Sequence, residues 1–128
     1  YVDGYITKRK VIAQAYRSLL GCVKGIRTLN DIDGVEHGYP YFPILIDKEL
    51  LGRSRDEVYE ELKKHNVFSR RYFFPLISQF PTYRGLPSAS VENLPVADKV
   101  PEQVLCLPIY PELKISCLQK IVELIIDN

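Results

Sequence analysis

A segment rich in residues that break helices and strands, residues 75–95, most constrains how this chain can fold. It contains Pro75, Pro81, Gly85, Pro87, Ser88, Ser90 and Pro95. Proline removes a backbone donor and fixes φ, so this stretch cannot form one long regular element. We expect a loop with one short turn of helix, while the regular elements lie before and after it.

The N-terminal part predicts an amphipathic helix over about residues 5–20. Its apolar residues recur at helical spacing, at Ile12, Tyr16, Leu19 and Leu20. Gly21 is a natural stop. The first turn is strongly basic, which opposes the positive end of the helix dipole, so we expect the helix to continue upstream in a longer protein.

Three further helices are predicted from local signals. Ser54 and Glu57 have the spacing of a capping box, and Val58 and Leu62 should face inward until the helix ends at His65–Asn66. Pro95 suits the first position of a helix over about 95–103. Ser116 is expected to cap the last helix. Its buried stripe would be Leu118, Ile121, Val122 and Ile125, and its wet face Lys120, Glu123 and Asp127.

Apolar and β-branched runs predict three short strands, at residues 41–47, 67–74 and 104–107. Pro43 favours an edge position or a bulge for the first of them. Between residues 21 and 40, only 23–29 could hold another short strand. Helices and strands are interleaved without an internal repeat, so residues 1–128 predict a single two-layer α+β domain.

Composition excludes several classes of partner. The net charge is +1, so the electrostatic attraction that drives binding to nucleic acid or to anionic membranes is missing. The apolar runs are far shorter than the roughly 20 residues of a membrane helix. Cys22, Cys106 and Cys117 are widely spaced, so we expect reduced, mostly buried thiols in a cytoplasmic protein. The chain has no Met and opens at Tyr1, so we interpret it as a piece of a longer, non-secreted protein.

Candidate chemistry is confined to one segment. Glycine-rich phosphate-binding patterns are absent, and His37 and His65 have no second ligand at metal spacing. Residues 69–76 instead place Arg70 and Arg71 beside three aromatic residues. Arg70 and Tyr72 would share one face of a strand, where an arginine can clasp a carboxylate or a phosphate. The alternative is an aromatic core strand with two snorkelling arginines, which composition alone favours.

This segment resembles the DegT/DnrJ/EryC1/StrS aminotransferases, which use pyridoxal phosphate to aminate keto-sugars attached to nucleotides. The resemblance covers nearly the whole chain. Its motifs lie at 8–10 with Tyr16, 41–44, 54–57, 70–76 and 105–113, and Leu-Pro-Ile-Tyr-Pro-Glu-Leu over 107–113 is the most specific. It implies the two-layer small domain of a fold-type I aminotransferase, with a short antiparallel or mixed sheet, flanking helices and a long N-terminal helix.

One position departs from the family pattern Arg-x-Tyr-Phe-x-Pro-Leu-His. Arg70, Tyr72, Phe73, Pro75 and Leu76 match it, but Ile77 stands where the family has histidine. Any role of that histidine would fall to another group, Ser78 or Gln79. The resemblance therefore implies Arg70, Tyr72, Ser78 and Gln79 as substrate-binding candidates, with the loop over 77–88 shaping the sugar pocket.

The resemblance also implies what lies outside this chain. The Schiff-base lysine, the aspartate that pairs with the pyridinium nitrogen and the phosphate-binding groups belong to the family's large N-terminal domain, so we expect no catalytic or cofactor-binding residue here and an inactive isolated chain. The implied parent is a homodimer that transfers the amino group of glutamate to a dTDP-keto-6-deoxyhexose, with dTDP-4-keto-6-deoxyglucose favoured. The alternative is a non-catalytic α+β module that binds a ligand or a partner protein.

Overall fold

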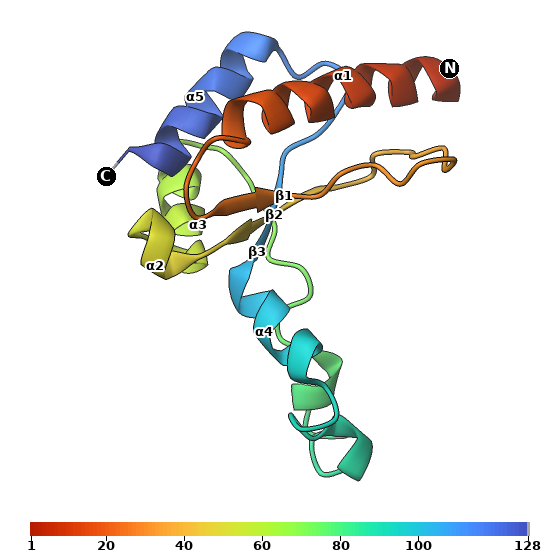
Figure 1. Cartoon of the computed structure of the whole chain (residues 1–128), viewed down its shortest axis with the longest axis vertical. Coiled ribbons are helices and arrows are strands. Elements are labelled where there is room, and N and C mark those ends of the chain that lie inside the picture. Colours follow the sequence, from red (N-terminus) through yellow and green to blue (C-terminus); the bar gives the residue numbers. More distant parts are fainter. Residues whose placement is uncertain (128) are drawn as a thin grey trace.

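Three strands form one antiparallel sheet in the order β1-β2-β3 in the computed structural model, which describes residues 1–127 (Figure 1). The strands are β1 (Ile26–Thr28), β2 (Phe42–Ile46) and β3 (Val104–Leu107). Side chains alternate along β2, so that Phe42, Ile44 and Ile46 are buried and the residues between them are partly exposed. The strands expected within 23–29, 41–47 and 104–107 are thus confirmed.

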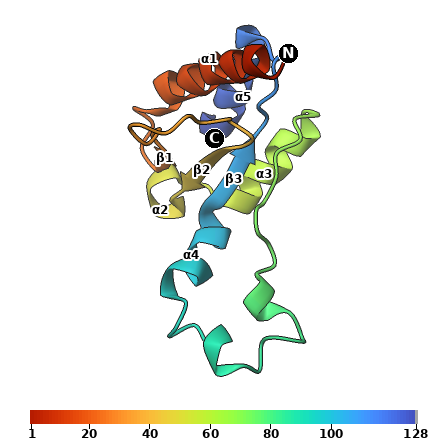
Figure 2. The ribbon, with the colours of Figure 1, turned by 90° about the vertical axis from the view of Figure 1, so that its right-hand side faces the viewer.

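Three helices supply the second layer: α1 (Val2–Leu20), α3 (Arg55–Lys64) and α5 (Ile115–Ile126). α5 contacts both α1 and α3, and the apolar faces of all three join one core with the buried face of the sheet (Figures 1 and 2). The predicted two-layer α+β fold is therefore confirmed. The shorter elements are α2 (Lys48–Leu51), α4 (Pro95–Gln103) and two 3₁₀ turns, η1 (Ile77–Gln79) and η2 (Pro87–Ala89). No helix among the described residues is long and apolar enough to cross a membrane.

Local signals predicted the helix boundaries well. Ser54 and Glu57 form the expected capping box, and α3 ends with Asn66 in a left-handed conformation. α4 begins at Pro95 as predicted. α1 begins at Val2, one turn before the predicted start. The expected stripe of α5 is buried, but Ser116 does not cap the helix, because α5 begins at Ile115 with Lys114 in the N-cap position and Ser116 lies inside its first turn.

Pro43 lies in the central strand, so the expected edge position is wrong. Its neighbour on β3 is Cys106, whose amide and carbonyl both bond to Arg70 and so point away from β2. The missing N–H of Pro43 therefore points to the β1 side. Because β1 ends at Thr28, opposite Ile44, no described strand needs a donor there.

The predicted strand over 67–74 is also wrong, since only Arg70 forms a bridge, to Cys106. The next ladder positions on β3 would be Pro108 and Val104. Pro108 has no N–H, and its carbonyl accepts from the Tyr16 hydroxyl at 3.0 Å. The Val104 carbonyl accepts from Arg55 at 3.4 Å. Side chains from α1 and α3 thus occupy the groups that a fourth strand would use.

The cysteines are free, but only Cys106 is buried, so the expectation of mostly buried thiols is wrong. Cys22 lies in the turn after α1, and Cys117 precedes the buried residue Leu118 on α5. Burial raises the pKa of the Cys106 thiol to about 11. Whether a cysteine is buried depends on how its helix or turn packs against the core, which the sequence does not specify.

Residues 75–95 form a projection that we call the arm, and it extends away from the end of the sheet opposite α1 and α5 (Figures 1 and 2). It is a loop, as predicted, with two short 3₁₀ turns rather than one turn of helix. Exposed apolar side chains follow it at Ile77, Phe80, Tyr83, Leu86 and Val91.

Candidate functional site

Arg70 is fixed to the sheet through its backbone, while its side chain is exposed. Its amide donates to the Cys106 carbonyl at 3.0 Å, and its carbonyl accepts from the Cys106 amide at 2.8 Å. The β3 strand is buried along its whole length. Arg70 is therefore a cation presented to solvent from a rigid support.

Two tyrosines adjoin Arg70. Arg70 Nη1 donates to the Tyr72 hydroxyl at 2.8 Å, and the rings of Tyr72 and Tyr41 meet edge to face at a centroid distance of 4.8 Å. Interaction with the Tyr72 side chain raises the pKa of Tyr41 above the ordinary value of a phenol. Sequence reasoning missed Tyr41 as a site residue, because its approach to Tyr72 joins segments far apart in the chain.

Arg70 and Tyr41, but not Tyr72, line a pocket of about 370 Å³, which we call the Arg70 pocket. It is lined by Pro40, Tyr41, Phe68, Arg70, Cys106, Leu107, Pro108, Ile109 and Tyr110. A guanidinium with free N–H groups can bind a carboxylate or a phosphate, and phenol hydroxyls at the same rim can bind its remaining oxygens. The pocket thus suits the anionic part of a small ligand.

Arg71 has a structural role instead. Its Nη1 lies 3.0 Å from Asp56 Oδ1, and its guanidinium sits over the Tyr59 ring at 4.4 Å. Buried Arg55 makes an ionic contact of 2.8 Å with the same carboxylate. The alternative of an aromatic core strand is wrong, because this segment forms only one bridge and Phe73 and Phe74 are exposed. Arg71 packs on the fold, whereas the Arg70 side chain is exposed.

Ser78 and Gln79 lie apart from the Arg70 pocket, in η1 of the arm. Gln79 Oε1 accepts from the Leu76 amide at 3.3 Å, so this side chain caps its own turn. Ser78 lines a separate, mostly apolar pocket of about 430 Å³ formed within the arm. Within residues 1–127, the structure brings Arg70 and Tyr72 together but joins neither of them to Ser78 or Gln79.

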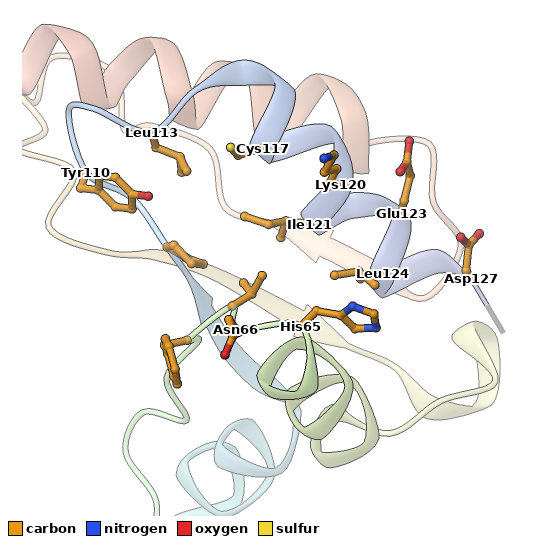
Figure 3. A pocket seen from close by; sticks show the side chains of 13 residues that line it. His65, Asn66, Tyr110, Leu113, Cys117, Lys120, Ile121, Glu123, Leu124 and Asp127 are labelled. Carbon is orange, nitrogen blue, oxygen red and sulfur yellow. The ribbon is translucent and has the colours of Figure 1, made fainter.

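A larger cavity of about 650 Å³ lies between the end of α3 and α5 (Figure 3). Figure 3 shows His65 and Asn66 on one side and Ile121 and Leu124 of α5 on the other. His65 Nε2 lies 3.2 Å from Glu61 within its own helix. Its walls are mostly apolar, and among the described residues no side-chain hydrogen bond joins its polar lining residues His65, Cys117, Lys120 and Glu123 to one another. The Arg70 pocket, where Arg70 is bonded to Tyr72, is the better candidate.

The lysines, the residues that could hold pyridoxal phosphate covalently, are all exposed. They are Lys8, Lys10, Lys24, Lys48, Lys63, Lys64, Lys99, Lys114 and Lys120. A lysine that forms a Schiff base needs a desolvated pocket, so these residues do not fit that role. Residues 1–127 also contain no group of His, Cys, Asp and Glu side chains that could hold a metal ion.

Comparison with known proteins matches the whole chain to one family. The model of the DegT/DnrJ/EryC1/StrS aminotransferase family matches residues 1–126. The chain is 49% identical over 128 residues to a dTDP-4-amino-4,6-dideoxy-D-glucose transaminase from Escherichia coli, covering 100% of this chain and 34% of that protein. It is 34% identical over 125 residues to a transaminase of the same name from Shigella dysenteriae, covering 98% and 33%. The chain thus spans about a third of the length of these relatives.

Solved structures agree with this match. The structure of DesI in the presence of its TDP-sugar product has a TM-score of 0.83 and 26% identity, covering 94% of this chain and 30% of DesI. The aminotransferase TlmJ from Streptoalloteichus hindustanus shares the fold, with a TM-score of 0.82 and 23% identity over 98% of this chain and 32% of TlmJ. Residues 1–127 therefore share the fold of about a third of each of these longer chains.

Proposed function

The chain belongs to the DegT/DnrJ/EryC1/StrS aminotransferase family, and from this we propose that it is the C-terminal small domain of a pyridoxal-phosphate-dependent transaminase. The parent enzyme transfers the amino group of glutamate to a dTDP-keto-6-deoxyhexose, and dTDP-4-keto-6-deoxyglucose is the substrate we favour. The observation that carries this proposal is the 49% identity, along the full chain, to a transaminase named for the corresponding 4-amino sugar.

The proposal divides the work between this chain and the rest of the protein. Pyridoxal phosphate supplies the electron sink for amino transfer, and the residues that hold it lie in the large N-terminal domain outside this chain. Arg70 binds an anionic group of a substrate, either the carboxylate of glutamate or a phosphate of the nucleotide, and Tyr72 orients the guanidinium. The arm, with Ser78 and Gln79, shapes the sugar pocket in a homodimer. The free cysteines support a cytoplasmic location.

The parent protein tests this function directly. Expressed from its full gene, it is incubated with pyridoxal phosphate, glutamate and dTDP-4-keto-6-deoxyglucose while 2-oxoglutarate release and product mass are followed. We expect a glutamate-dependent amino-sugar nucleotide, and NMR of the product distinguishes amination at position three from position four. Bound cofactor without turnover directs the search to other keto-sugars, whereas absence of bound cofactor favours the non-catalytic module that binds a ligand or a partner protein.

The same proposal predicts that residues 1–128 alone are inactive. Pyridoxal phosphate is added to this chain, which is then passed through a gel-filtration column, and the absorbance spectrum is recorded. We expect no stoichiometric cofactor band to survive, because every lysine is exposed. A stable stoichiometric band would contradict the proposal that the cofactor is held by residues outside this chain.

A further inference from the structure

The loop between β1 and β2 is held by a network of three polar side chains. Arg17 of α1 pairs with Asp31 through two contacts, Nη2 to Oδ1 at 2.6 Å and Nη1 to Oδ2 at 3.2 Å. Arg17 Nε donates to the Leu29 carbonyl at 2.9 Å. The Tyr39 hydroxyl also donates to Asp31 Oδ2. One carboxylate thus joins both ends of the loop to α1.

Tyr39 adopts a conformation that a bulky residue rarely takes. Its φ is +49°, in the left-handed region, and its side chain is only 3% exposed. This conformation is unfavourable for a non-glycine residue unless its surroundings enforce it. The Asp31 bond holds its hydroxyl, and His37 Nδ1 accepts from its amide at 3.0 Å. The network therefore enforces a sharp turn just before β2.

That turn sets the direction of Tyr41. Tyr41 follows Tyr39 by two residues and immediately precedes β2, and its side chain is 50% exposed. It is directed to the rim of the Arg70 pocket, where its ring meets Tyr72. Contacts thus join Asp31 to Tyr39 and Tyr41 to Tyr72 and Arg70, and the backbone of residues 39–41 connects the two groups.

We propose that Tyr41 is a second binding residue of the Arg70 pocket, beside Arg70, and that Asp31 is the residue that positions it. Tyr41 donates its hydroxyl proton in a hydrogen bond to the anionic group that Arg70 binds. This inference rests on the proposed function and deepens it, since it assigns part of the specificity to a loop outside the family motif at 70–76. The ligand is a carboxylate or a phosphate.

Equilibrium binding separates the two sources of that anion. The full-length protein is titrated calorimetrically with glutamate and, separately, with dTDP. We expect Tyr41→Phe to weaken binding of one ligand by about threefold to tenfold, as for the loss of one hydrogen bond, and to leave the other unchanged. Arg70→Ala should weaken binding of the same ligand more strongly than Tyr41→Phe does. The ligand that responds identifies the anion as the donor carboxylate or the nucleotide phosphate.

A double-mutant cycle tests the positioning role of Asp31. Asp31→Asn should weaken binding of the same ligand in the wild-type background. It should have little further effect on that affinity in the Tyr41→Phe background, because Asp31 acts through Tyr41. Asp33→Asn, an exposed acid in the same loop, is the matched control and should leave both affinities unchanged. A purely structural role of Asp31 would give equal effects in both backgrounds.

Three results would overturn the inference: unchanged affinities for both ligands in Tyr41→Phe, additive effects of Asp31→Asn and Tyr41→Phe, or a wild-type protein that binds neither ligand. Turnover of the wild-type protein is measured in parallel. If the wild-type protein catalyses amino transfer but Tyr41→Phe binds both ligands normally, the proposed function stands and only the role of Tyr41 is refuted. If binding follows the expected pattern but the wild-type protein transfers no amino group, the proposed function is refuted and the binding site stands.

Discussion

Arg70 Nη1 lies 2.8 Å from the Tyr72 hydroxyl oxygen and donates a hydrogen bond to it, while the backbone of Arg70 bridges to Cys106 of β3. The backbone of Arg70 is therefore fixed by β3 and its guanidinium by Tyr72, although the side chain is exposed. This arrangement leaves its other N–H groups free for a bidentate contact with an anion.

Replacing Arg70 tests this arrangement in the full-length enzyme. We expect Arg70→Ala to raise the KM for one substrate by about tenfold or more, since a charged hydrogen bond contributes roughly 1.5 to 3 kcal/mol. Steady-state kinetics with each substrate varied in turn provide the measurement. Arg27→Ala removes an exposed arginine from β1 and is the matched control. Equal KM values for Arg70→Ala and wild type would make Arg70 a structural residue.

Two glycines with similar backbone conformations should differ in their tolerance of alanine. Gly25 has φ +84°, and an added Cβ would lie 2.4 Å from the Leu51 amide nitrogen, whereas Gly34 has φ +77° and open space around it. Gly34→Ala should cost only the left-handed penalty, about 1 to 2 kcal/mol. Gly25→Ala adds a steric clash of about 1 to 3 kcal/mol. Urea unfolding of both variants measures their free energies of unfolding, and we expect Gly25→Ala to lose more than Gly34→Ala. Equal losses in the two variants would contradict this prediction.

The three thiols of this chain should react at different rates. Cys22 and Cys117 are exposed, but Cys106 is buried and its pKa is raised to about 11. The thiolate is the reactive form, so a thiol reagent at pH 8 should modify Cys22 and Cys117 quickly and Cys106 only after unfolding. Mass spectrometry of peptides from timed samples locates each modification. Rapid modification of Cys106 in the folded chain would contradict the packing of β3.

The ion pair between Arg17 and Asp31 should make stability depend on pH. Hydrogen bonds from Arg17 and then Tyr39 lower the pKa of Asp31 from 3.8 to about 2. A carboxylate whose pKa is lower in the folded state adds stability above its unfolded pKa and loses it as the pH falls towards the folded pKa. Wild type should therefore exceed Asp31→Asn in stability by about 0.5 to 1 kcal/mol at pH 7.

This advantage should narrow between pH 4 and pH 2, the interval between the two pKa values of Asp31. Urea unfolding of both proteins at several pH values measures it. Asp33→Asn, which removes an exposed acid with no hydrogen bond to Arg17, should follow the wild-type curve. A difference between wild type and Asp31→Asn that stays constant down to pH 2 would rule out the charged pair as its source.

The sequence alone determined those elements whose signals are local. The periodic apolar residues of α1 and α5, the Ser54–Glu57 capping box and Pro95 at the first position of α4 each predicted a helix that is present. Helix hydrogen bonds join residues four apart, so a short window of sequence contains both partners. The family motif at 70–76 likewise identified Arg70 and Tyr72, which the structure brings together.

Tertiary structure decided what depends on partners far along the chain. Residues 67–74 have the composition of a strand, but Pro108, Tyr16 and Arg55 occupy or remove the groups with which it would pair. Pro43 lies in a central strand because β1 ends one residue too early to need its N–H. Tyr41 lines the Arg70 pocket at the end of a loop that Asp31 ties to α1, so its position depends on contacts with distant residues. Strand pairing and loop direction depend on contacts between distant residues, and their partners are set only when the chain packs.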